Sequence, residues 1–426
     1  MTNQMTANEN KGKGSSFEWW MVSNIAFGAG FSAFISLLIP PFVTDVTGNA
    51  ADAGIVMAII SLAAILGPVL GGFADKYRAH RLILSLGVLG MAVGFFMYSI
   101  SAEAKALYAL DAIILGVSVA AINAVGPVFI VGAGLSQALQ AKRLTTFNLL
   151  APVGQVIGGA IMAGAVSAGM SFGNRFLIAA GFMLLTAVIT WFSSAKPAKR
   201  IILPEDKPDE YHEEGKKSFG LKQMFISTFG LYLLILVLSS TGNNGINAQI
   251  ANILPNVYGI DQATTSGLIS LAGLLNILFF FVAGAWLGRS GAMPDFTTGN
   301  IMRLVGAIGL AVLGMVAKSP ILLVAASMQI FYQANPFVRL TQPVLAMRFS
   351  TIPPGQATGW VIAAAAFGSF LGSLIGGWLA DAVGFNAINW MGAIAVGAAV
   401  LLIFFGLWPA ERKKRAAESA APVPTA

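Results

Sequence analysis

Apolar stretches of about 20 or more residues follow one another along nearly the whole chain, and short polar segments separate them. Such a stretch is long enough to cross a hydrocarbon core of roughly 30 Å, and in lipid an α-helix satisfies its own backbone hydrogen bonds over that length. The pattern therefore predicts an all-α polytopic membrane protein with twelve transmembrane helices. The expected helices span residues 18–44, 51–74, 82–101, 106–135, 146–169, 175–194, 222–258, 261–288, 299–317, 320–347, 356–380 and 385–409.

The longest polar interruption lies near the middle of the chain. It carries Pro197, Pro204 and Pro208 among charges of both signs, which is typical of a flexible linker. We therefore expect an N-terminal segment, a six-helix bundle, a cytoplasmic linker, a second six-helix bundle and a tail. Their ranges are 1–17, 18–194, 195–221, 222–409 and 410–426.

The two halves show a weak internal repeat at a shift of 214 residues. The matched pairs are Pro41 with Pro255, Gly28 with Gly242, and Gly158 with Gly372. A few matches of this kind arise by chance in glycine-rich helices. Together with the central linker, they favour two pseudo-symmetric bundles related by duplication.

Basic residues are concentrated on one side of the predicted helices. An even number of helices puts both termini on that side, and the other side carries only Lys105, Arg175 and Lys318. The positive-inside rule therefore places both termini in the cytoplasm, and the net charge of +7 reflects this topology, not a nucleic-acid partner. Short loops on the opposite side are compatible with the inner (cytoplasmic) membrane of a bacterium.

Composition disfavours several classes of protein. Hydrophobic residues make up 56% of the chain and charged residues only 10%, which does not describe a soluble domain. The absence of cysteine excludes a disulfide framework and a thiolate metal site. The predicted helices also contain no cluster of acids, histidines or cysteines that would serve a membrane-embedded enzyme, so we expect no catalytic residue, metal or cofactor.

The segment between the second and third predicted helices carries the most specific motif. It reads Gly71-Gly72-Phe73-Ala74-Asp75-Lys76-Tyr77-Arg78-Ala79-His80-Arg81. Gly71, Asp75 and Lys76 resemble the hallmark loop of the major facilitator superfamily of secondary transporters, Gly-x-x-x-Asp-(Arg/Lys)-x-Gly-(Arg/Lys)-(Arg/Lys). Arg78 stands where that family prefers glycine, and Arg81 falls one place late. The resemblance covers nearly the whole chain and implies the family's twelve-helix fold and transport by alternating access.

Asp75 of this motif lies at the C-terminal end of its predicted helix, where a negative charge opposes the helix dipole and needs a cation. Arg78 or Arg81 can supply that cation. The resemblance implies that the eleventh helix, which begins near Gly355, lies beside this site, and we expect the contact to close the cytoplasmic gate. The expected gating residues are Gly71, Asp75, Lys76, Arg78 and Arg81. The alternative is that the basic residues only anchor the loop at the membrane surface.

Polar residues inside the predicted helices indicate where a solute would bind. On the tenth helix four of them fall within an arc of roughly 80° at 100° per residue, namely Tyr332, Asn335, Arg339 and Gln342. The seventh helix carries Asn243, Asn244 and Asn247 on one face with Ser239 and Ser240. Asn24 on the first helix is a further candidate. For any single asparagine, hydrogen bonding between helices is the alternative role.

Arg339 is the residue that most narrows the class of solute. An intramembrane arginine costs a few kcal/mol unless it faces water, a partner or a ligand, and its planar guanidinium suits a carboxylate or phosphate. We expect it to bind an anionic group of the solute. The alternative is a structural arginine that snorkels toward the cytoplasm or bonds helix carbonyls.

Asp111 is the only acid well inside a predicted helix, so it is the candidate for proton coupling. Burial favours the protonated form of a carboxyl group. The alternatives are that Asp111 pairs with Lys105 or faces interfacial water. In either case facilitated diffusion, without a coupling proton on Asp111, stays an alternative mechanism.

These residues favour a secondary active or facilitated transporter of a small polar, anionic solute, acting as a monomer within the lipid bilayer. The alternative is an exporter of amphipathic drug-like compounds, driven by proton exchange. Such an exporter would need an apolar binding pocket, and the residues expected to line it are Trp19, Trp20, Phe331, Tyr332 and Phe337.

Overall fold

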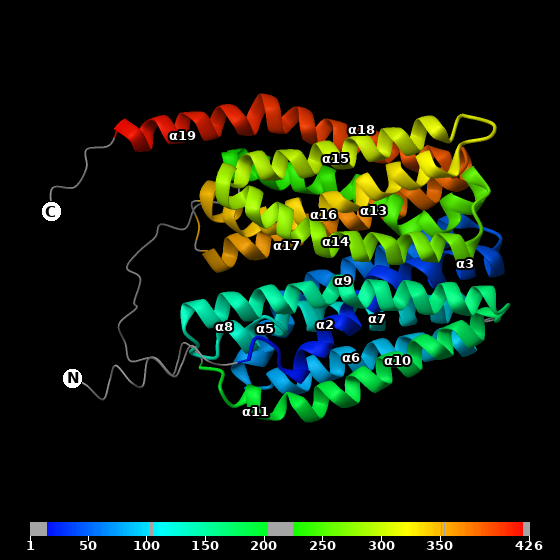
Figure 1. Cartoon of the computed structure of the whole chain (residues 1–426), viewed down its shortest axis with the longest axis horizontal. Helices are drawn as coiled ribbons and strands as arrows, with labels where there is room; N and C mark the ends of the chain where they lie inside the picture. Colours follow the sequence, from blue (N-terminus) through cyan, green and yellow to red (C-terminus); the bar gives the residue numbers. More distant parts are fainter. Residues whose placement is uncertain (1–14, 102–104, 203–224, 351, 353, 421–426) are drawn as a thin grey trace. The chain divides into compact units, whose positions relative to one another are not determined.

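The structure, a computed structural model, describes residues 15–101, 105–202, 225–350, 352 and 354–420 (Figure 1). Every regular element within those ranges is a helix. Twelve helices there are long and apolar enough to cross a membrane, so the predicted all-α fold with twelve spans is confirmed.

The first six spans contain several interrupted helices. The first span joins η2 (Trp19–Met21), α2 (Val22–Phe27), the π-helical η3 (Gly28–Ile35) and α3 (Ser36–Thr47). The second joins α4 (Ala50–Ala63), η4 (Ala64–Leu66) and α5 (Gly67–Lys76). The remaining elements are α6 (His80–Ile100), α7 (Lys105–Val125), α8 (Val128–Val131), α9 (Gln137–Ser167), α10 (Phe172–Ser193) and the short α11 (Ala195–Ala198).

The other six spans are longer on average and less interrupted. They are α13 (Thr228–Tyr258), α14 (Gln262–Ser290), α15 (Ala292–Leu313), α16 (Ile321–Phe349), α17 (Pro354–Ala382) and α18 (Asn386–Leu402). The last span continues through the π-helical η6 (Ile403–Leu407) into α19 (Trp408–Ala420).

Local sequence signals set the helix ends. After α3 the chain turns at Gly48, whose φ of 71° is a left-handed conformation that costs glycine little. Asn49 follows, and its side-chain oxygen accepts a hydrogen bond of 2.8 Å from the backbone N–H of Ala51. This bond caps the first turn of α4.

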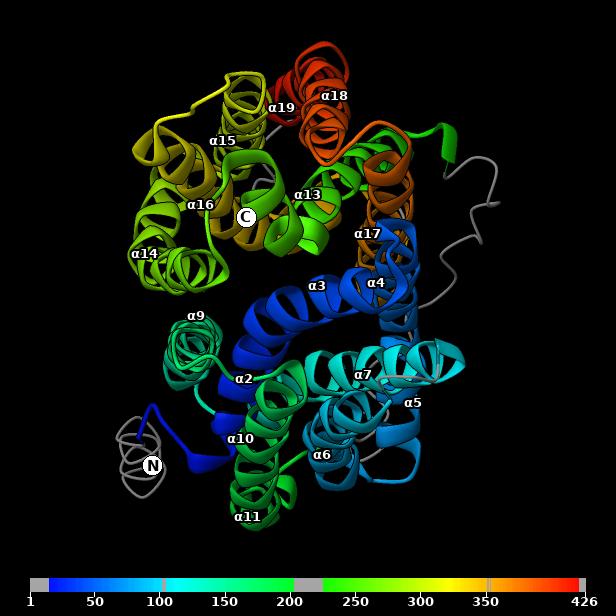
Figure 2. The same cartoon turned by 90° about the vertical axis from the view of Figure 1, so that its right-hand side faces the viewer.

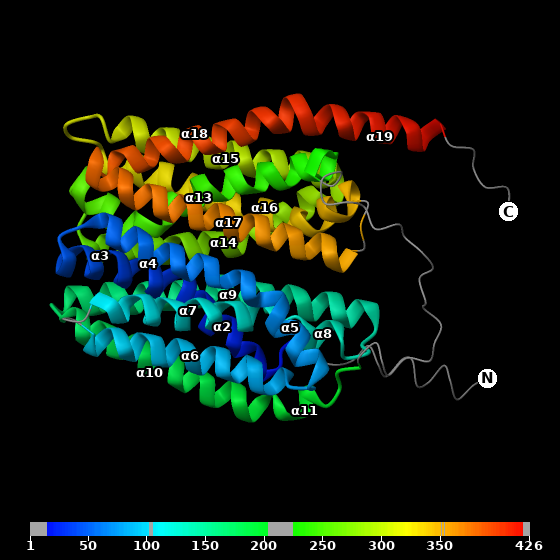
Figure 3. The same ribbon diagram turned by 180° about the vertical axis from the view of Figure 1, so that it is seen from behind.

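The chain forms two compact units that do not coincide with a simple cut at the middle. Unit 1 comprises Met1–Glu213 and Asn247–Ile277, and unit 2 comprises Glu214–Ile246 and Leu278–Ala426. In unit 1, α6 packs against α7 and α10 (Figure 2). In unit 2, α15 packs against α16 and α18 (Figure 3). The division into two six-helix bundles at the predicted boundaries stays a prediction.

The predicted segments outside the bundles are only partly described. The N-terminal segment 1–17 is described from residue 15, and the linker 195–221 is described to residue 202, where it begins with α11. The predicted tail from residue 410 starts inside α19, so the last helix runs further than expected.

Two helix crossings, one in each half of the chain, contain glycines that are matched by the internal repeat. A Cβ at Gly158 of α9 would lie 3.1 Å from the Cα of Ala29 in the first span. A Cβ at Gly372 of α17 would lie 2.2 Å from the carbonyl oxygen of Thr241 in α13. The fifth span thus crosses the first, and the eleventh crosses the seventh, at glycines matched by the shift of 214 residues. Small residues let helix backbones approach closely in this way.

Two predicted helices begin seven or more residues earlier than expected. The ninth span was placed at 299–317, yet α15 begins at Ala292. Pro294 and Asp295 made its first turn resemble a loop, but a helix tolerates proline in its first turn and its N-terminal dipole favours an acid there. The fifth span begins at Gln137, not at residue 146. Arg143, which lies outside the predicted helix 146–169, therefore belongs to a helix.

Candidate solute and gating sites

The polar face predicted on α16 is not uniformly exposed. Tyr332 is buried, Asn335 and Gln342 are half-buried, and Arg339 is exposed. Arg339 lies about one turn past the middle of α16. Within the described ranges, no residue hydrogen-bonds or ion-pairs with its side chain. Arg339 is therefore the charged member of this face that remains without a protein partner.

A second arginine, which the sequence did not single out as a candidate, lies beside this face. Arg303 of α15 is only 5% exposed. Its Nη1 donates to Oγ of Ser239 at 2.8 Å, and its Nη2 donates to Oδ1 of Asn335 at 2.7 Å. Ser239 in turn donates to Oδ1 of Asn300 at 2.6 Å. Asn300 and Arg303 both lie inside the predicted helix 299–317, and their spacing of three residues places them on one helix face, so the sequence did carry a signal for this pair.

The three candidate asparagines of α13 divide into one that is hydrogen-bonded and two whose side-chain oxygens lack partners among the described residues. Asn244 donates from Nδ2 to the carbonyl oxygen of Ser369 at 3.0 Å and to Oγ of Ser373 at 2.8 Å, both on α17. Its contact is the interhelical bond that was the alternative role. The Oδ1 atoms of Asn243 and Asn247 are buried and have no hydrogen-bond partner in the described part of the chain.

Asn24 also serves as a bond between helices. It is 5% exposed, and its Nδ2 donates to the carbonyl oxygen of Phe147 on α9. This contact holds α2 against α9 inside unit 1. Asn24 thus has the interhelical role that is the alternative for each asparagine, and its contact with a solute stays a prediction.

Most of the aromatic side chains considered for an amphipathic pocket are packed within their own unit. Trp20 is 1% exposed and stacks on Phe129 at 4.8 Å between ring centroids. Phe331 and Phe337 are 0% and 3% exposed, respectively. Trp19, at 66%, is the exposed one of the five.

Asp111 is completely buried near one end of α7. Its Oδ2 accepts a hydrogen bond from Oγ of Ser101 at 3.2 Å, whereas Oδ1 has no partner in the described part of the chain. The side chain of Lys105, the alternative partner, lies outside the described residues. A second buried acid, Asp295 of α15, was not predicted; neither of its carboxyl oxygens has a described partner.

Asp75 has a partner that the sequence did not predict. His80 Nε2 lies 2.8 Å from Oδ1 of Asp75, and His80 is 3% exposed at the start of α6. Arg81 instead donates to the carbonyl oxygen of Trp191 at 3.0 Å and lies 4.1 Å from the centre of its ring. Arg78 adopts a φ of 50°, which few residues other than glycine adopt, at the position where the family motif has glycine. Lys76 lies over the ring of Tyr77 at 5.4 Å, and a Cβ at Gly71 would meet nothing within 4 Å.

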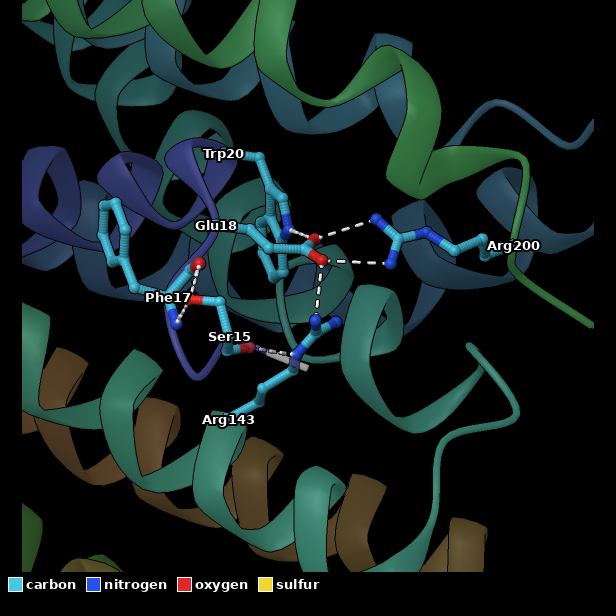
Figure 4. Close-up of polar contacts among 6 residues, drawn as sticks. All are labelled: Ser15, Phe17, Glu18, Trp20, Arg143 and Arg200. Atoms are coloured by element: carbon cyan, nitrogen blue, oxygen red, sulfur yellow. Dashed lines mark hydrogen bonds and ion pairs between the residues drawn. The ribbon is translucent and has the colours of Figure 1, made fainter. Parts of the chain in front are cut away.

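A charge network that sequence reasoning did not predict lies at the start of the first span (Figure 4). Glu18 Oε1 is 2.9 Å from Nη2 of Arg143 and 3.0 Å from Nη1 of Arg200. Its Oε2 accepts from Arg200 at 3.1 Å and from Trp20 Nε1 at 2.8 Å. Arg143 also donates to the carbonyl oxygen of Ser15 at 3.1 Å. From the sequence alone, these two arginines count only as basic residues on the side of the termini.

Burial and hydrogen bonding act on Glu18 in opposite directions. Burial by itself raises the pKa of this carboxyl group, but the hydrogen bonds from Arg200 and Trp20 and the charge of Arg143 outweigh it. The pKa of Glu18 is therefore held below its usual value. The ionised form of Glu18 fastens η2 to α9 and to the segment that follows α11.

Comparison with known proteins places this architecture in a family. The model of the Major Facilitator Superfamily matches residues 20–354. A stretch of 229 residues is 22% identical to Multidrug resistance protein 1 of Bacillus subtilis (strain 168), covering 53% of this chain and 56% of that protein. The match thus spans about half the length of that relative.

Solved structures share the fold over nearly the whole chain. The nucleoside transporter NupG matches with a TM-score of 0.69 at 14% identity, over 91% of this chain and 96% of its own. A POT family transporter in complex with 5-aminolevulinic acid matches with a TM-score of 0.69 at 15% identity, over 91% and 95%. The D-xylose-proton symporter matches with a TM-score of 0.69 at 14% identity, over 90% and 96%. Because the family model covers most of the chain and twelve helices can span a bilayer, the chain belongs to the major facilitator superfamily and is an integral membrane secondary transporter.

Proposed function

We propose that this transporter carries a small anionic solute and that Arg339 is the counter-charge of that solute. The observation that carries the proposal is the state of Arg339 itself. It lies within a membrane span, it is exposed, and no described residue neutralises or hydrogen-bonds it. An arginine in that position needs water, an anion or both around its guanidinium group.

The neighbours of Arg339 support binding of a polar solute. Asn335 precedes it by one helical turn, and Gln342 follows it by three residues, so both amides lie on the same side of α16. Both are half-buried. A guanidinium group flanked by amides offers the planar, multiple hydrogen bonding that suits a carboxylate or a phosphate.

The competing role for Arg339 is structural. Its long side chain could extend along α16 toward the membrane surface and keep its charge in water without binding a solute. In that case Arg339→Gln would change the stability of the protein but not its selectivity among solutes.

Thermal stabilisation of the purified protein in detergent separates these roles. We expect organic anions to raise the melting temperature of the wild type, and we expect sugars, neutral amino-acid amides and cationic drugs to leave it unchanged. Arg339→Gln should abolish the effect of the anions. Stabilisation by neutral or cationic compounds in both proteins would contradict the proposal and make Arg339 structural.

An exporter of amphipathic compounds is the second candidate, because the chain is 22% identical over 229 residues to a protein named Multidrug resistance protein 1. The packing of Trp20, Phe331 and Phe337 inside their units speaks against the particular pocket expected for such compounds. Stabilisation by many unrelated cationic amphiphiles, retained in Arg339→Gln, would favour this second function.

We further propose that Asp111 carries a coupling proton and that the segment from Gly71 to Arg81 gates the cytoplasmic side. The burial of Asp111 with one unpartnered oxygen supports the first proposal. The contact of Asp75 with His80 supports the second, since it ties Asp75 at the end of α5 to the start of α6. The proposed setting is a monomer in the inner membrane of a bacterium, with both termini in the cytoplasm.

A further inference from the structure

The buried contact between Arg303 and Asn335 fixes how the amide of Asn335 is turned. A guanidinium group donates hydrogen bonds through its N–H groups and has no atom that accepts one. The atom that Nη2 of Arg303 meets at 2.7 Å must therefore be the carbonyl oxygen of the amide, and the structure has Oδ1 there. A flipped amide would place two sets of donors against each other.

The rest of the network holds Arg303 in this direction. Its Nη1 donates to Oγ of Ser239, and the single hydroxyl hydrogen of Ser239 is used toward Oδ1 of Asn300. Asn300 donates in turn to the carbonyl oxygen of Phe296 at 2.9 Å. Nη1 and Nη2 of Arg303 each have an acceptor, whereas its buried Nε has no hydrogen-bond partner among the described residues. Loss of either of these two bonds would leave a further buried donor of Arg303 unpaired.

The consequence for Asn335 is that only its NH2 group is left for a ligand. No described residue accepts a hydrogen bond from Nδ2 of Asn335, which is half-buried. Arg339 follows one turn later on the same side of α16, and its guanidinium group also only donates. At these two neighbouring positions the face offers donors and no acceptor.

The charge of Arg303 adds to this bias. No carboxylate in the described part of the chain forms an ion pair with Arg303, so its positive charge is met only by the neutral oxygens of Ser239 and Asn335. In surroundings of low dielectric constant, a charge compensated in this way still attracts an anion nearby.

We propose that Arg303 is a positioning residue of the solute site: by occupying Oδ1 of Asn335, it turns Nδ2 outward beside Arg339 and so selects a solute whose carboxylate or phosphate accepts from both. This inference rests on the proposed function and specifies the solute class further. A solute that presents an ammonium or amide hydrogen at this point finds no acceptor there and is rejected.

Asn335→Asp is the variant that tests this assignment. Its carboxylate has the shape of the amide and can still accept from Arg303, so the variant should fold and melt at or above the temperature of the wild type. Its second oxygen, however, would face the solute in place of the NH2 group. Asn256→Asp adds the same charge on the exposed side of α13 and is the matched control.

The probes are pairs that differ only in the acceptor group, benzoate with benzamide and lactate with lactamide, together with methylphosphonate. We expect wild type and Asn256→Asp to be stabilised by at least one anion and not by its amide. Asn335→Asp should lose apparent anion affinity by about ten-fold or more, because one hydrogen bond to a charged group is replaced by repulsion. Arg303→Lys, which still donates to Oδ1, should keep the preference for the anion, whereas Arg303→Gln, which can accept from Nδ2, should lose it.

Three results would overturn the proposal in different ways. In the first, Arg339→Gln is no longer stabilised by anions while Asn335→Asp binds them as the wild type does. Arg303 then does not set the selectivity, but the proposed function stands. If no anion stabilises the wild type, the proposed function fails together with this inference. If Asn335→Asp does not fold, the carboxylate is not accepted by Arg303, and the assigned orientation of Asn335 is wrong.

Discussion

At the scale of single residues, the buried charges of this protein differ in how they are compensated. Glu18 is met by two arginines and an indole N–H, Arg303 only by neutral oxygens, and Asp295 by no described residue. A charge removed from water without a partner costs far more than one that is paired and hydrogen-bonded. The fully compensated Glu18 is therefore suited to a structural role, and the less compensated groups are suited to ligands or protons.

Replacing Glu18 should show its structural role directly. Glu18→Gln leaves the largely buried Arg143 without its countercharge, so we expect the free energy of unfolding to fall by about 2 kcal/mol. The melting temperature in detergent measures this change. Asp45→Asn removes an exposed acid of the same unit and should have little effect.

The effect of Glu18→Gln should also depend on pH. Because the pKa of Glu18 is lowered in the folded protein, its contribution to stability is fully present above the usual glutamate value of 4.5 and is lost as the pH falls through the lowered value. The difference in melting temperature between wild type and variant should therefore be constant near neutral pH and shrink in acid. A difference that stayed unchanged in acid would show that the charge of Glu18 is not what stabilises the fold.

Replacing Asp111 should separate proton coupling from solute binding. Asp111→Asn keeps the size of the side chain and can still accept from Ser101. In proteoliposomes we expect it to abolish the acceleration of transport by a pH gradient while the solute still raises the melting temperature. Gradient-driven transport equal to that of wild type and of Asp45→Asn would exclude Asp111 as the proton carrier.

At the scale of helices, the glycine crossings decide how closely the spans pack. A Cβ at Gly372 would lie 2.2 Å from the carbonyl oxygen of Thr241, whereas a Cβ at Gly284 of α14 would meet nothing within 4 Å. We expect Gly372→Ala to destabilise the protein by about 1–3 kcal/mol through overpacking. Gly284→Ala should be neutral or stabilise it by up to about 1 kcal/mol, because alanine favours a helix.

Thermal unfolding of both glycine variants tests this contrast. If the two substitutions lower the melting temperature equally, the close approach of α13 and α17 is not the reason why position 372 requires glycine. The same comparison can be made in unit 1 with Gly158→Ala, whose Cβ would crowd Ala29 and Ala33.

Helix periodicity and length predicted the number of spans but not where every span begins. The apolar core of each span is long, so its existence is clear from composition alone. The starts of α9 and α15 lie in polar residues that a helix can hold once neighbouring helices bury them, as they bury Arg143 and Asp295. Tertiary packing of this kind leaves no signal in a local hydropathy pattern.

The same limit explains which candidate site residues could be foreseen. The sequence alone identifies Arg339 as a candidate, because a single arginine inside an apolar span is unusual. The bond between Arg303 and Asn335 joins residues 32 positions apart on two helices, and the bond from Asn244 to α17 joins residues more than 120 positions apart. Pairings of this kind depend on which helices are neighbours, which one sequence does not specify.

At the scale of the whole molecule, the segment around Asp75 should bias the conformational equilibrium. Asp75→Asn removes the negative charge that meets His80, and we expect the population to shift toward the state open to the cytoplasm. The chain contains no cysteine, so a single introduced cysteine is a unique label. Labelling of Gln342→Cys should increase and labelling of Asn247→Cys should decrease in the Asp75→Asn background.

The control for this experiment is Asp45→Asn, which removes an exposed acid far from the motif in sequence. Equal labelling of both cysteines in all three backgrounds would mean that the motif anchors the loop and does not gate.

The network around Glu18 has a consequence for how the protein is made. Arg200 follows Glu18 by 182 residues, so the two groups leave the ribosome roughly ten to forty seconds apart at ordinary rates of synthesis. Throughout that interval Glu18 lacks Arg200, although Arg143, its other partner, is synthesised part of the way through it. The ion pair with Arg200 therefore forms only after the sixth span has been synthesised, and it fastens the oldest part of the chain to the newest at the moment when the first half is complete.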